Sequence, residues 1–377
     1  MTRLGGLADN LATAITMAQE FATRMTVTLV LDDDGPLPDR DAVVLRASPG
    51  AALRLQKAGC DRFVMAVAPD NLANAIPLMD QVMGALGVSF APVCLALPAD
   101  GVTVYQGHLF RGTAMLNGAE PSIIRMLSQN SDGSAGLVPY GLVAQGVVSL
   151  RRALAGLREQ GRRFAVVDAV NVDALVTLVS ASAGLPMLIG TTALVAALSA
   201  DVSQATPPVP APSIPAAPIP AAPIPAQPMP ALPLTALNGP AVILSGSTTR
   251  QASFQAGIAR DALAHMTLPT GSDGQDAVTW ALAHLGSSPI LISCPPGQEP
   301  ADVLAQIAAA LVQAGVQRLM LTGNATTEAV LTQLAVSRLT PDPAQPWWMA
   351  ERAGPALMLA LPAGQGGPNA ILDAFEG

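Results

Sequence analysis

The sequence predicts an α/β protein of two domains with mostly parallel sheets, joined by a Pro/Ala-rich linker. Three observations support this class. The chain has 377 residues, which exceeds one ordinary domain of roughly 100–200 residues. Short apolar runs alternate with Ala-rich helical stretches in both halves. Between the halves, residues 204–235 are mostly Pro, Ala and Ile.

The apolar runs and helical stretches give the order of elements. Expected strands cover residues 26–31, 42–47, 62–68, 91–97, 163–169 and 186–190, and then 241–245, 289–293, 318–322 and 356–361. Amphipathic stretches between several of them include residues 71–86, 147–160 and 301–314. Near-continuous apolar strands that alternate with helices are typical of parallel sheets covered on both faces.

The Pro-rich segment contains four near-repeats, which start at Ile214, Ile219, Ile224 and Met229. Proline removes a backbone donor and fixes φ, so neither a helix nor an inner strand is expected here. Such a segment favours polyproline II and acts as a semi-rigid spacer. A ligand for proline-binding domains is the alternative, but no Arg or Lys flanks the prolines. We therefore predict domains at residues 1–203 and 236–377, with a linker at residues 204–235.

The composition excludes several classes of protein. The mean hydropathy is +0.42, yet no run of about 20 apolar residues lacks breakers, so a membrane protein is not expected. The most apolar stretch, residues 185–200, contains Pro186 and Gly190 and predicts a buried strand and helix. The net charge is −8 and Lys57 is the only lysine, so nucleic acid is a poor partner. We expect a cytoplasmic protein, because the N-terminus lacks a secretory pattern.

The cysteines and histidines favour neither a disulfide framework nor a metal centre. The chain has three cysteines with no CxxC spacing, and three histidines far apart in the sequence. No Walker A, dinucleotide, HExxH or GxSxG motif is present. We therefore expect no protein-borne metal site, and any chemistry must come from subtler signals at the ends of strands.

The first such signal is the pair Asp9-Asn10, which follows the strand-like LGGLA and precedes a helical run. A carboxylate there can accept a proton from a substrate hydroxyl or hold a magnesium ion. Alternatively, Asp9 or Asn10 merely caps the helix. The residues alone leave both interpretations open.

Two turns in the second half form another signal. Residues 245–249 and 323–327 are small-residue turns, each placed between a predicted strand and a predicted helix. Free N–H groups and the helix dipole make such turns anion sites, although any tight strand-to-helix connection needs similar residues. Gly364 belongs to a third glycine-rich turn. Three such turns in one domain add support to a nucleotide site, and ordinary tight strand-to-helix connections stay open as the alternative.

A third signal is the ribbon TVYQGHLF at residues 103–110, which contains Tyr105, Gln106 and His108 in a chain poor in aromatic residues. It fits either recognition of a polar substrate or a hairpin that packs on its neighbours.

These residues resemble the four-carbon acid sugar kinase family, in particular its 3-oxo-tetronate kinase subgroup. The similar segments are LADN (7–10), VYQGHLF (104–110), LNG (116–118), GLVPYGLVAQG (136–146), AVVDAV (165–170), VILSGS (242–247), VQRLMLTGNATTEAV (316–330) and LALPAGQGGP (359–368). The resemblance implies an N-terminal acid-sugar domain, a C-terminal ATP domain, and chemistry between them.

The resemblance also implies roles for single residues. ATP would donate its γ-phosphoryl group to the terminal hydroxyl of a four-carbon oxo acid, with Mg²⁺ neutralising charge. Asp9 would be catalytic, and substrate-binding residues would be Asn10, Asn71, Gln106 and His108. ATP-binding residues would be Ser245, Ser247, Gly323, Asn324, Ala325, Thr326 and Gly364. The expected partners are therefore an acid sugar and ATP, and self-association is left open.

Departures from the family pattern support a second hypothesis. The family's LADDFTGATD is LADNLATAIT here, so Asn10 stands in place of an Asp. The polar substrate loop reads FVMAVAPDN at 63–71, the Lys-x-Arg pattern reads Arg46-Ala47-Ser48, and Ala325 replaces a Glu. Losing a general base costs about 10²–10⁴-fold in rate, with further losses that do not add simply. The alternative is therefore a catalytically impaired pseudokinase that binds a ligand or a partner.

Overall fold

The computed structural model describes residues 3–31, 35–116, 120–131, 133–204, 237, 239–295, 297–342, 346–361 and 369–375. The predicted linker lies outside these ranges except for residue 204, and so does Gly364. The predicted boundaries near residues 203 and 236 therefore remain predictions. We call the described residues before the linker the N-terminal arm and those after it the C-terminal arm.

The N-terminal arm is built on a parallel sheet with strand order β2-β3-β1-β4-β11-β5-β10-β9. The strands are β1 (Leu4–Ala8), β2 (Val27–Val30), β3 (Ala42–Arg46), β4 (Arg62–Ala66), β5 (Ala91–Cys94), β9 (Ala135–Val138), β10 (Phe164–Val167) and β11 (Met187–Gly190). Most of their residues are buried, as the apolar runs predict. The predicted mostly parallel α/β class is confirmed.

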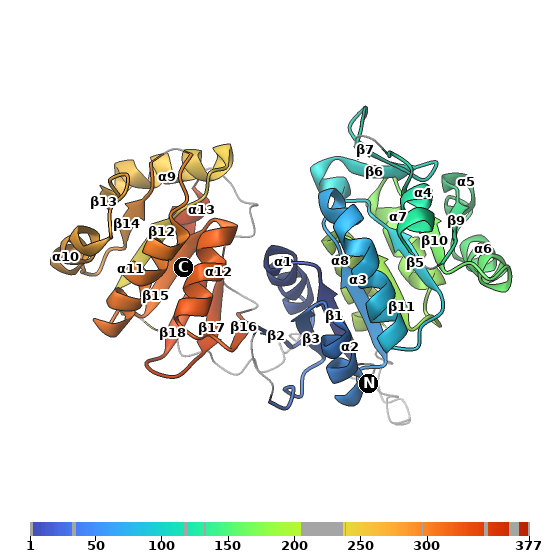
Figure 1. Cartoon of the computed structure of the whole chain (residues 1–377), viewed down its shortest axis with the longest axis horizontal. Helices are drawn as coiled ribbons and strands as arrows, with labels where there is room; N and C mark the ends of the chain where they lie inside the picture. Colours follow the sequence, from blue (N-terminus) through green and yellow to red (C-terminus); the bar gives the residue numbers. More distant parts are fainter. Residues whose placement is uncertain are drawn as a thin grey trace, which may run out of the picture.

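Helices cover both faces of this sheet. They are α1 (Leu11–Ala22), α2 (Pro49–Lys57), α3 (Leu72–Ala85), α4 (Ile123–Asn130), α5 (Tyr140–Val143), α6 (Val147–Glu159), α7 (Val172–Ala181) and α8 (Thr192–Gln204), with 3-10 turns η1 (Pro69–Asn71) and η2 (Pro98–Asp100). α1, α8, α7 and α6 pack in succession, and α2, α3 and α4 form a second series. Figure 1 shows α2 and α3 in front of the sheet. A small antiparallel sheet of β6 (Val102–Tyr105), β7 (His108–Arg111) and β8 (Ala114–Met115) lies at one end.

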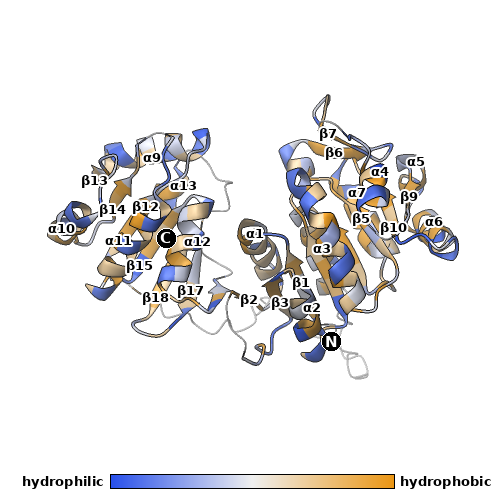
Figure 2. Cartoon of the chain, viewed as in Figure 1, coloured by the Kyte–Doolittle hydropathy of each residue, from blue (hydrophilic) through white to orange (hydrophobic). Residues whose placement is uncertain are grey.

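The C-terminal arm has strand order β13-β14-β12-β15-β18-β17-β16, in which β16 and β17 are antiparallel to their neighbours. The strands are β12 (Ala241–Ser245), β13 (Ala264–Thr267), β14 (Ile290–Ser293), β15 (Arg318–Thr322), β16 (Arg338–Pro341), β17 (Trp347–Glu351) and β18 (Leu357–Ala360). The helices are α9 (Arg250–Ala262), α10 (Gln275–His284), α11 (Ala301–Gln313), α12 (Asn324–Gln333) and α13 (Ala370–Asp373). Figure 2 shows apolar residues concentrated in the strands and polar residues on outer helices such as α6 and α10.

The two arms share one continuous sheet. β16 pairs antiparallel with β2, with Leu339 opposite Leu29, and the Leu31 N–H donates to Ser337 O at 2.9 Å. The sequence predicts a sheet in each domain but gives no sign that they join. We call this pairing of β2 with β16 the seam. It brings α1 against α12 at the centre of the molecule (Figure 1).

The apolar stretch 185–200 forms the buried strand β11 and the first part of α8, as predicted. Among the described residues, no helix combines the length and the apolar character needed to cross a membrane.

Gly190, at the end of β11, allows the close approach of β5 and α8. A β-carbon there would collide with the carbonyl oxygen of Cys94 and lie 2.6 Å from a methyl carbon of Leu194. Gly184 is the matched surface position, because a β-carbon there meets no atom within 4 Å.

We expect Gly190→Ala to lower the free energy of unfolding by about 1–3 kcal/mol, because overpacking next to backbone cannot relax easily. Gly184→Ala should change it by less than about 0.5 kcal/mol. Urea unfolding followed by circular dichroism measures both. Equal stability of the two variants would contradict the close packing at β11.

Candidate functional site

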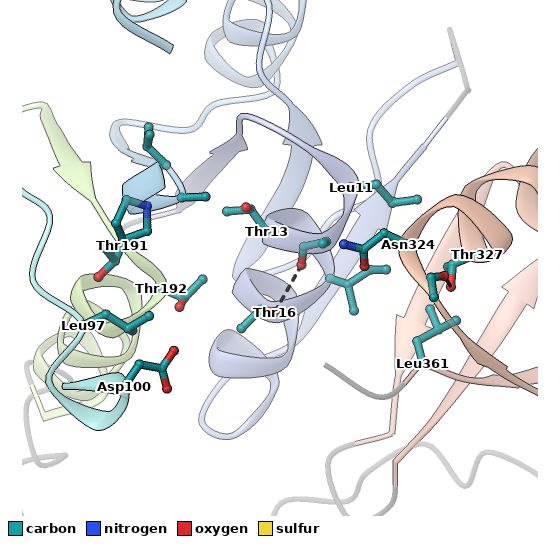
Figure 3. A pocket seen from close by; sticks show the side chains of 16 residues that line it. Leu11, Thr13, Thr16, Leu97, Asp100, Thr191, Thr192, Asn324, Thr327 and Leu361 are labelled. Atoms are coloured by element: carbon teal, nitrogen blue, oxygen red, sulfur yellow. Dashed lines mark hydrogen bonds between the residues drawn. The ribbon is translucent and has the colours of Figure 1, made fainter. Parts of the chain in front are cut away.

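A cavity of about 310 Å³ lies between the two arms. Its walls come from the carboxyl ends of β4, β5 and β11, from the starts of α1 and α8, and from the turn between β15 and α12 (Figure 3). The lining residues are Leu11, Ala12, Thr13, Ile15, Thr16, Val67, Ala68, Pro69, Leu97, Asp100, Thr191, Thr192, Gly323, Asn324, Thr327 and Leu361. The carboxyl ends of parallel strands are where ligands of open α/β sheets bind.

Three predicted site residues meet beside this cavity. The Asp9 carboxylate accepts hydrogen bonds from Asn71 Nδ2 at 2.8 Å, from the Ala68 N–H at 3.1 Å and from Asn10 Nδ2 at 2.9 Å. Asn10 is also the N-cap of α1, since its Oδ1 accepts from the Thr13 N–H at 2.9 Å. Asp9 therefore joins β1 to the loop after β4, and the capping alternative holds for Asn10.

The predicted turns of the C-terminal arm also lie together. The Thr322 hydroxyl donates to Ser245 Oγ at 3.0 Å, and the Gly246 N–H donates to Thr322 O at 3.0 Å. A β-carbon on Gly323 would lie 2.9 Å from the backbone nitrogen of Ser247. Thus Ser245, Ser247 and Gly323 are neighbours, and Asn324, Ala325 and Thr326 follow in the first turn of α12. Gly364 lies outside the described residues.

Glu299 is a member of this group that sequence reasoning missed. Its carboxylate accepts from the Thr326 N–H at 3.0 Å and from the Thr326 hydroxyl at 3.2 Å. A carboxylate at this position complements the positive end of the α12 dipole. No sequence spacing indicates the contact, because 27 residues separate the two partners.

Cys294 lies near Glu299 in the same arm. Burial raises the pKa of the Cys294 thiol to about 11, and the charge of Glu299 adds to the rise. The thiol is therefore protonated at neutral pH and is a poor nucleophile.

Gln106 and His108 belong to a separate place on the N-terminal arm. Gln106 lies in the tight turn between β6 and β7 and has a φ of 52°, and His108 is the first residue of β7. His108 Nδ1 lies 2.7 Å from Gln106 O. Neither is among the described residues that line the cavity. The structure therefore does not bring them to the Asp9 group.

The buried Asp168, which follows β10, holds this hairpin. Its carboxylate accepts from the N–H groups of Gln106 at 2.8 Å, Gly107 at 2.9 Å and Tyr140 at 3.1 Å. Burial raises the pKa of this carboxyl group, while these N–H donors and the charge of His108 oppose the rise. Asp168 is thus a positioning residue for the predicted ribbon, within the AVVDAV segment that the sequence singles out.

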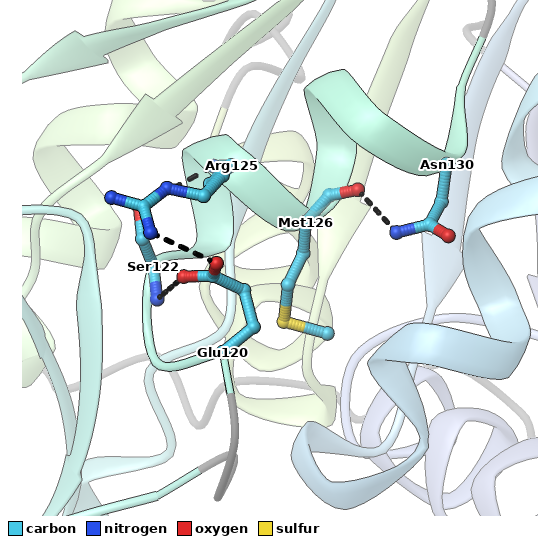
Figure 4. Close-up of polar contacts among 5 residues, drawn as sticks. All are labelled: Glu120, Ser122, Arg125, Met126 and Asn130. Atoms are coloured by element: carbon cyan, nitrogen blue, oxygen red, sulfur yellow. Dashed lines mark hydrogen bonds and ion pairs between the residues drawn. The ribbon is translucent and has the colours of Figure 1, made fainter.

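The start of α4 fixes the hairpin from the other side. The Ile123 N–H donates to Gly107 O at 3.0 Å. Glu120 accepts from the Ser122 N–H at 3.1 Å and from Arg125 Nη1 at 3.2 Å, and Ser122 caps the helix (Figure 4). Asn130 Nδ2 donates to Met126 O at the far end of the helix.

Comparisons with known proteins agree with this architecture. The family described as "Sugar-binding N-terminal domain" matches residues 74–198. A 3-oxo-tetronate kinase of Cupriavidus necator is 29% identical over 99% of this chain and 96% of its own length. One of Brucella melitensis is 28% identical over 98% and 94%.

The chain is thus similar over nearly its whole length to proteins named 3-oxo-tetronate kinase. Two solved structures show the same fold. A Salmonella typhimurium LT2 protein, described as a tRNA synthase, has a TM-score of 0.82 at 22% identity and covers 100% of this chain and 99% of its own. A Haemophilus influenzae protein has a TM-score of 0.76 at 22% identity, with 99% of each chain covered. At such identities these two matches concern the fold alone.

The sequence resemblance places an Asp where this chain has Asn10, which lies beside the cavity. The Asn10 side-chain amide donates a proton to Asp9. In the part of the chain that the structure describes, no three His, Cys, Asp or Glu side chains gather where a metal ion could bind.

The contacts of Asp168 lead to a first test of the hairpin. We expect Asp168→Asn to lower the free energy of unfolding by about 1–3 kcal/mol, because the amide NH₂ faces N–H donors and leaves them unsatisfied. Asp173→Asn, at an exposed position in the first turn of α7, should cost at most about 0.5 kcal/mol. Thermal unfolding of both variants measures the difference, and a harmless Asp168→Asn would disprove the anchoring role.

Proposed function

We propose that the chain is an ATP-dependent kinase that phosphorylates a hydroxyl group of a small sugar-derived substrate in the cleft between its arms. The observation that carries the proposal is the composition of the cavity wall. Thr13 and Thr191 come from the N-terminal arm, and Gly323 and Asn324 come from the predicted nucleotide turn of the C-terminal arm. A phosphoryl donor and an acceptor bound to the two arms would therefore face each other, and phosphoryl transfer depends mainly on such positioning.

The proposal assigns the nucleotide to residues 236–377 and the acceptor to residues 1–203. The N–H groups and small side chains around Ser245, Ser247 and Gly323 would hold the phosphates, with Asn324, Ala325, Thr326 and Gly364 completing the site. Mg²⁺ would arrive with the nucleotide, since it is commonly bound by phosphates and one or two carboxylates. Glu299 is the carboxylate beside these turns.

The acceptor class follows from the relatives, which are named for a four-carbon 3-oxo acid. Transfer of the γ-phosphoryl group to a terminal hydroxyl of a four-carbon compound is the corresponding reaction here. Asp9 is the proposed proton acceptor, because its carboxylate lies at the end of β1 beside the cavity. A cytoplasmic location, where ATP is available, is part of the same proposal.

The pseudokinase alternative has its own support. The Asp9 carboxylate already accepts three hydrogen bonds from the protein. Asn10 stands where the family pattern has a second Asp, and the Glu299 carboxylate already accepts from the first turn of α12. In this alternative the cleft binds a ligand without turnover.

The nucleotide turn is tested by Gly323→Ala. We expect at least a tenfold loss of Mg·ATP affinity, about 1.4 kcal/mol, because the added carbon would collide with Glu299 and crowd Ser247. Gly315→Ala is the matched control, since both glycines have a φ of +102° and a β-carbon on Gly315 meets no atom within 4 Å. Calorimetric titration measures both affinities. An equal effect of the two variants, or no binding by the wild type, would contradict the nucleotide site.

The variant Asn10→Asp tests the carboxylate that the family pattern has at position 10 and this chain lacks. We expect ADP release with a four-carbon acceptor to rise at least about tenfold, because a second carboxylate restores proton-accepting and metal-binding capacity. Asn171→Asp is the control, because Asn171 caps α7 with nearly the same backbone geometry (φ −152°, ψ 174°) as Asn10 (φ −150°, ψ 171°). A rate unchanged from the wild type would favour the pseudokinase alternative.

A further inference from the structure

The wall of the cavity has no basic side chain that could bind an acid. No Lys, Arg or His is among the described residues that line it. The undescribed segments add none, because every Lys, Arg and His of the chain lies within the described ranges. An acid in this cavity therefore depends on main-chain N–H groups and hydroxyl groups, which also bind anions at helix N-termini.

The start of α8 offers such N–H groups. The Thr191 hydroxyl precedes the helix and donates to Ala96 O at 2.5 Å, and the Leu194 N–H donates to Thr191 O at 3.0 Å. The N–H groups of Thr192 and Ala193 have no acceptor in the part of the chain that the structure describes. Because Thr192 lines the cavity, these two donors are available to a ligand.

The other two helices that begin at the cavity have acceptors from the protein. The Thr13 N–H of α1 donates to Asn10 Oδ1 at 2.9 Å, and the Thr326 N–H of α12 donates to Glu299 at 3.0 Å. Asp100 also lines the cavity but has a partner of its own within the chain, so we assign it no contact with a ligand.

A buried hydroxyl without a partner faces the same space. Thr13, in the first turn of α1, lines the cavity and is only 9% exposed. Its hydroxyl has no hydrogen bond to any described residue. Figure 3 shows this side chain pointing from α1 towards the side of the cavity where Thr191 and Thr192 lie. Buried hydroxyl groups are normally hydrogen-bonded, so this one indicates a ligand that accepts its proton.

We propose that the cavity binds the carboxylate of an acid between the start of α8 and Thr13. The N–H groups of Thr192 and Ala193 and the Thr13 hydroxyl donate to its two oxygens. A carboxylate is an acceptor only, so it matches donors that have no other partner. The volume of about 310 Å³ suits a small acid. The role of this acid as phosphoryl acceptor rests on the proposed kinase function, whereas its binding does not.

This carboxylate subsite also orients the acid. Figure 3 shows Thr191 and Thr192 on one side of the cavity, and Asn324 and Thr327 on the other. With its carboxylate at α8, a short acid directs its far end to the turn before α12, where the proposed nucleotide phosphates lie. The terminal hydroxyl is then the group that faces the phosphoryl donor. Thr13 is this chain's own contribution, because the family pattern has a Gly at that position.

The test compares erythronate with erythritol, two four-carbon ligands that differ in one terminal group. Calorimetric titration of the full-length chain should show erythronate binding at least about tenfold more tightly, because hydrogen bonds to a charged group are the stronger ones. Equal or tighter binding of erythritol would overturn the proposal, and so would the absence of measurable erythronate binding at millimolar ligand.

Thr13→Val removes the unpaired hydroxyl and keeps the shape of the side chain. Erythronate affinity should fall at least about tenfold, while erythritol affinity should change by no more than about twofold, because the lost donor serves the carboxylate. Thr177→Val is the matched control, since its hydroxyl already donates to Asp173 O at 2.8 Å and it lies outside the cavity lining. Unchanged erythronate binding by a folded Thr13→Val variant contradicts the proposal, as does an equal loss for both ligands.

The helix donor is tested by comparing Thr192→Pro with Thr192→Ala. Both remove the threonine side chain, but only proline removes the N–H, and proline is well tolerated at the first position of a helix. Thr192→Pro should bind erythronate at least about tenfold more weakly than Thr192→Ala. Thermal unfolding checks that each variant folds. Equal erythronate affinities of the two folded variants count against a role for the Thr192 N–H, and Thr13→Val decides if Thr192→Pro does not fold.

Turnover separates this inference from the kinase proposal. ADP release is measured with Mg·ATP and erythronate. If erythronate binding depends on Thr13 but no ADP forms, the kinase proposal fails and the carboxylate subsite stands. If ADP forms and Thr13→Val leaves the KM for erythronate unchanged, the carboxylate subsite fails and the kinase proposal stands.

Discussion

The antiparallel pairing of β16 with β2 decides how the rest of the molecule is arranged. The strands are more than 300 residues apart in the chain, with Leu339 opposite Leu29 and Arg338 opposite Val30. Backbone hydrogen bonds fix their relative direction and spacing. Because α1 follows β1, and α12 follows β15 further along the same sheet, this one pairing places the starts of both helices at a common cavity.

Much of the fold follows from local pattern, and the seam does not. The runs at residues 62–68 and 241–245 are continuous apolar segments, and they form the buried strands β4 and β12. Residues 338–341 are less distinctive, because their burial alternates and their role depends on a partner strand from the other arm. Periodicity reports which face of an element is buried, but it carries no information about which distant edge a strand joins.

The candidate site likewise depends on contacts between distant segments that local sequence pattern does not predict. Asp9 was a candidate from its place after a predicted strand, Asn71 was predicted through a resemblance, and a hydrogen bond of 2.8 Å joins them. Gln106 and His108 were assigned to the same substrate, yet they lie on a hairpin held by Asp168, away from the cavity lining. Glu299 was not predicted at all, because its partner Thr326 reaches it only through the tertiary packing of α11 and α12.

The seam also limits how the cleft can move. A Pro-rich linker alone would let two domains separate widely, but separation here would break the β2–β16 pairing and expose Leu29 and Leu339, both fully buried. The Arg46–Glu328 ion pair crosses between the arms on the same side of the seam as the cavity, and both side chains are more than half exposed. An exposed pair of this kind contributes little to stability, so it can open while the sheet stays intact. The relative position of the arms at the cavity is therefore set by the backbone pairing of β2 with β16 and not by the linker alone.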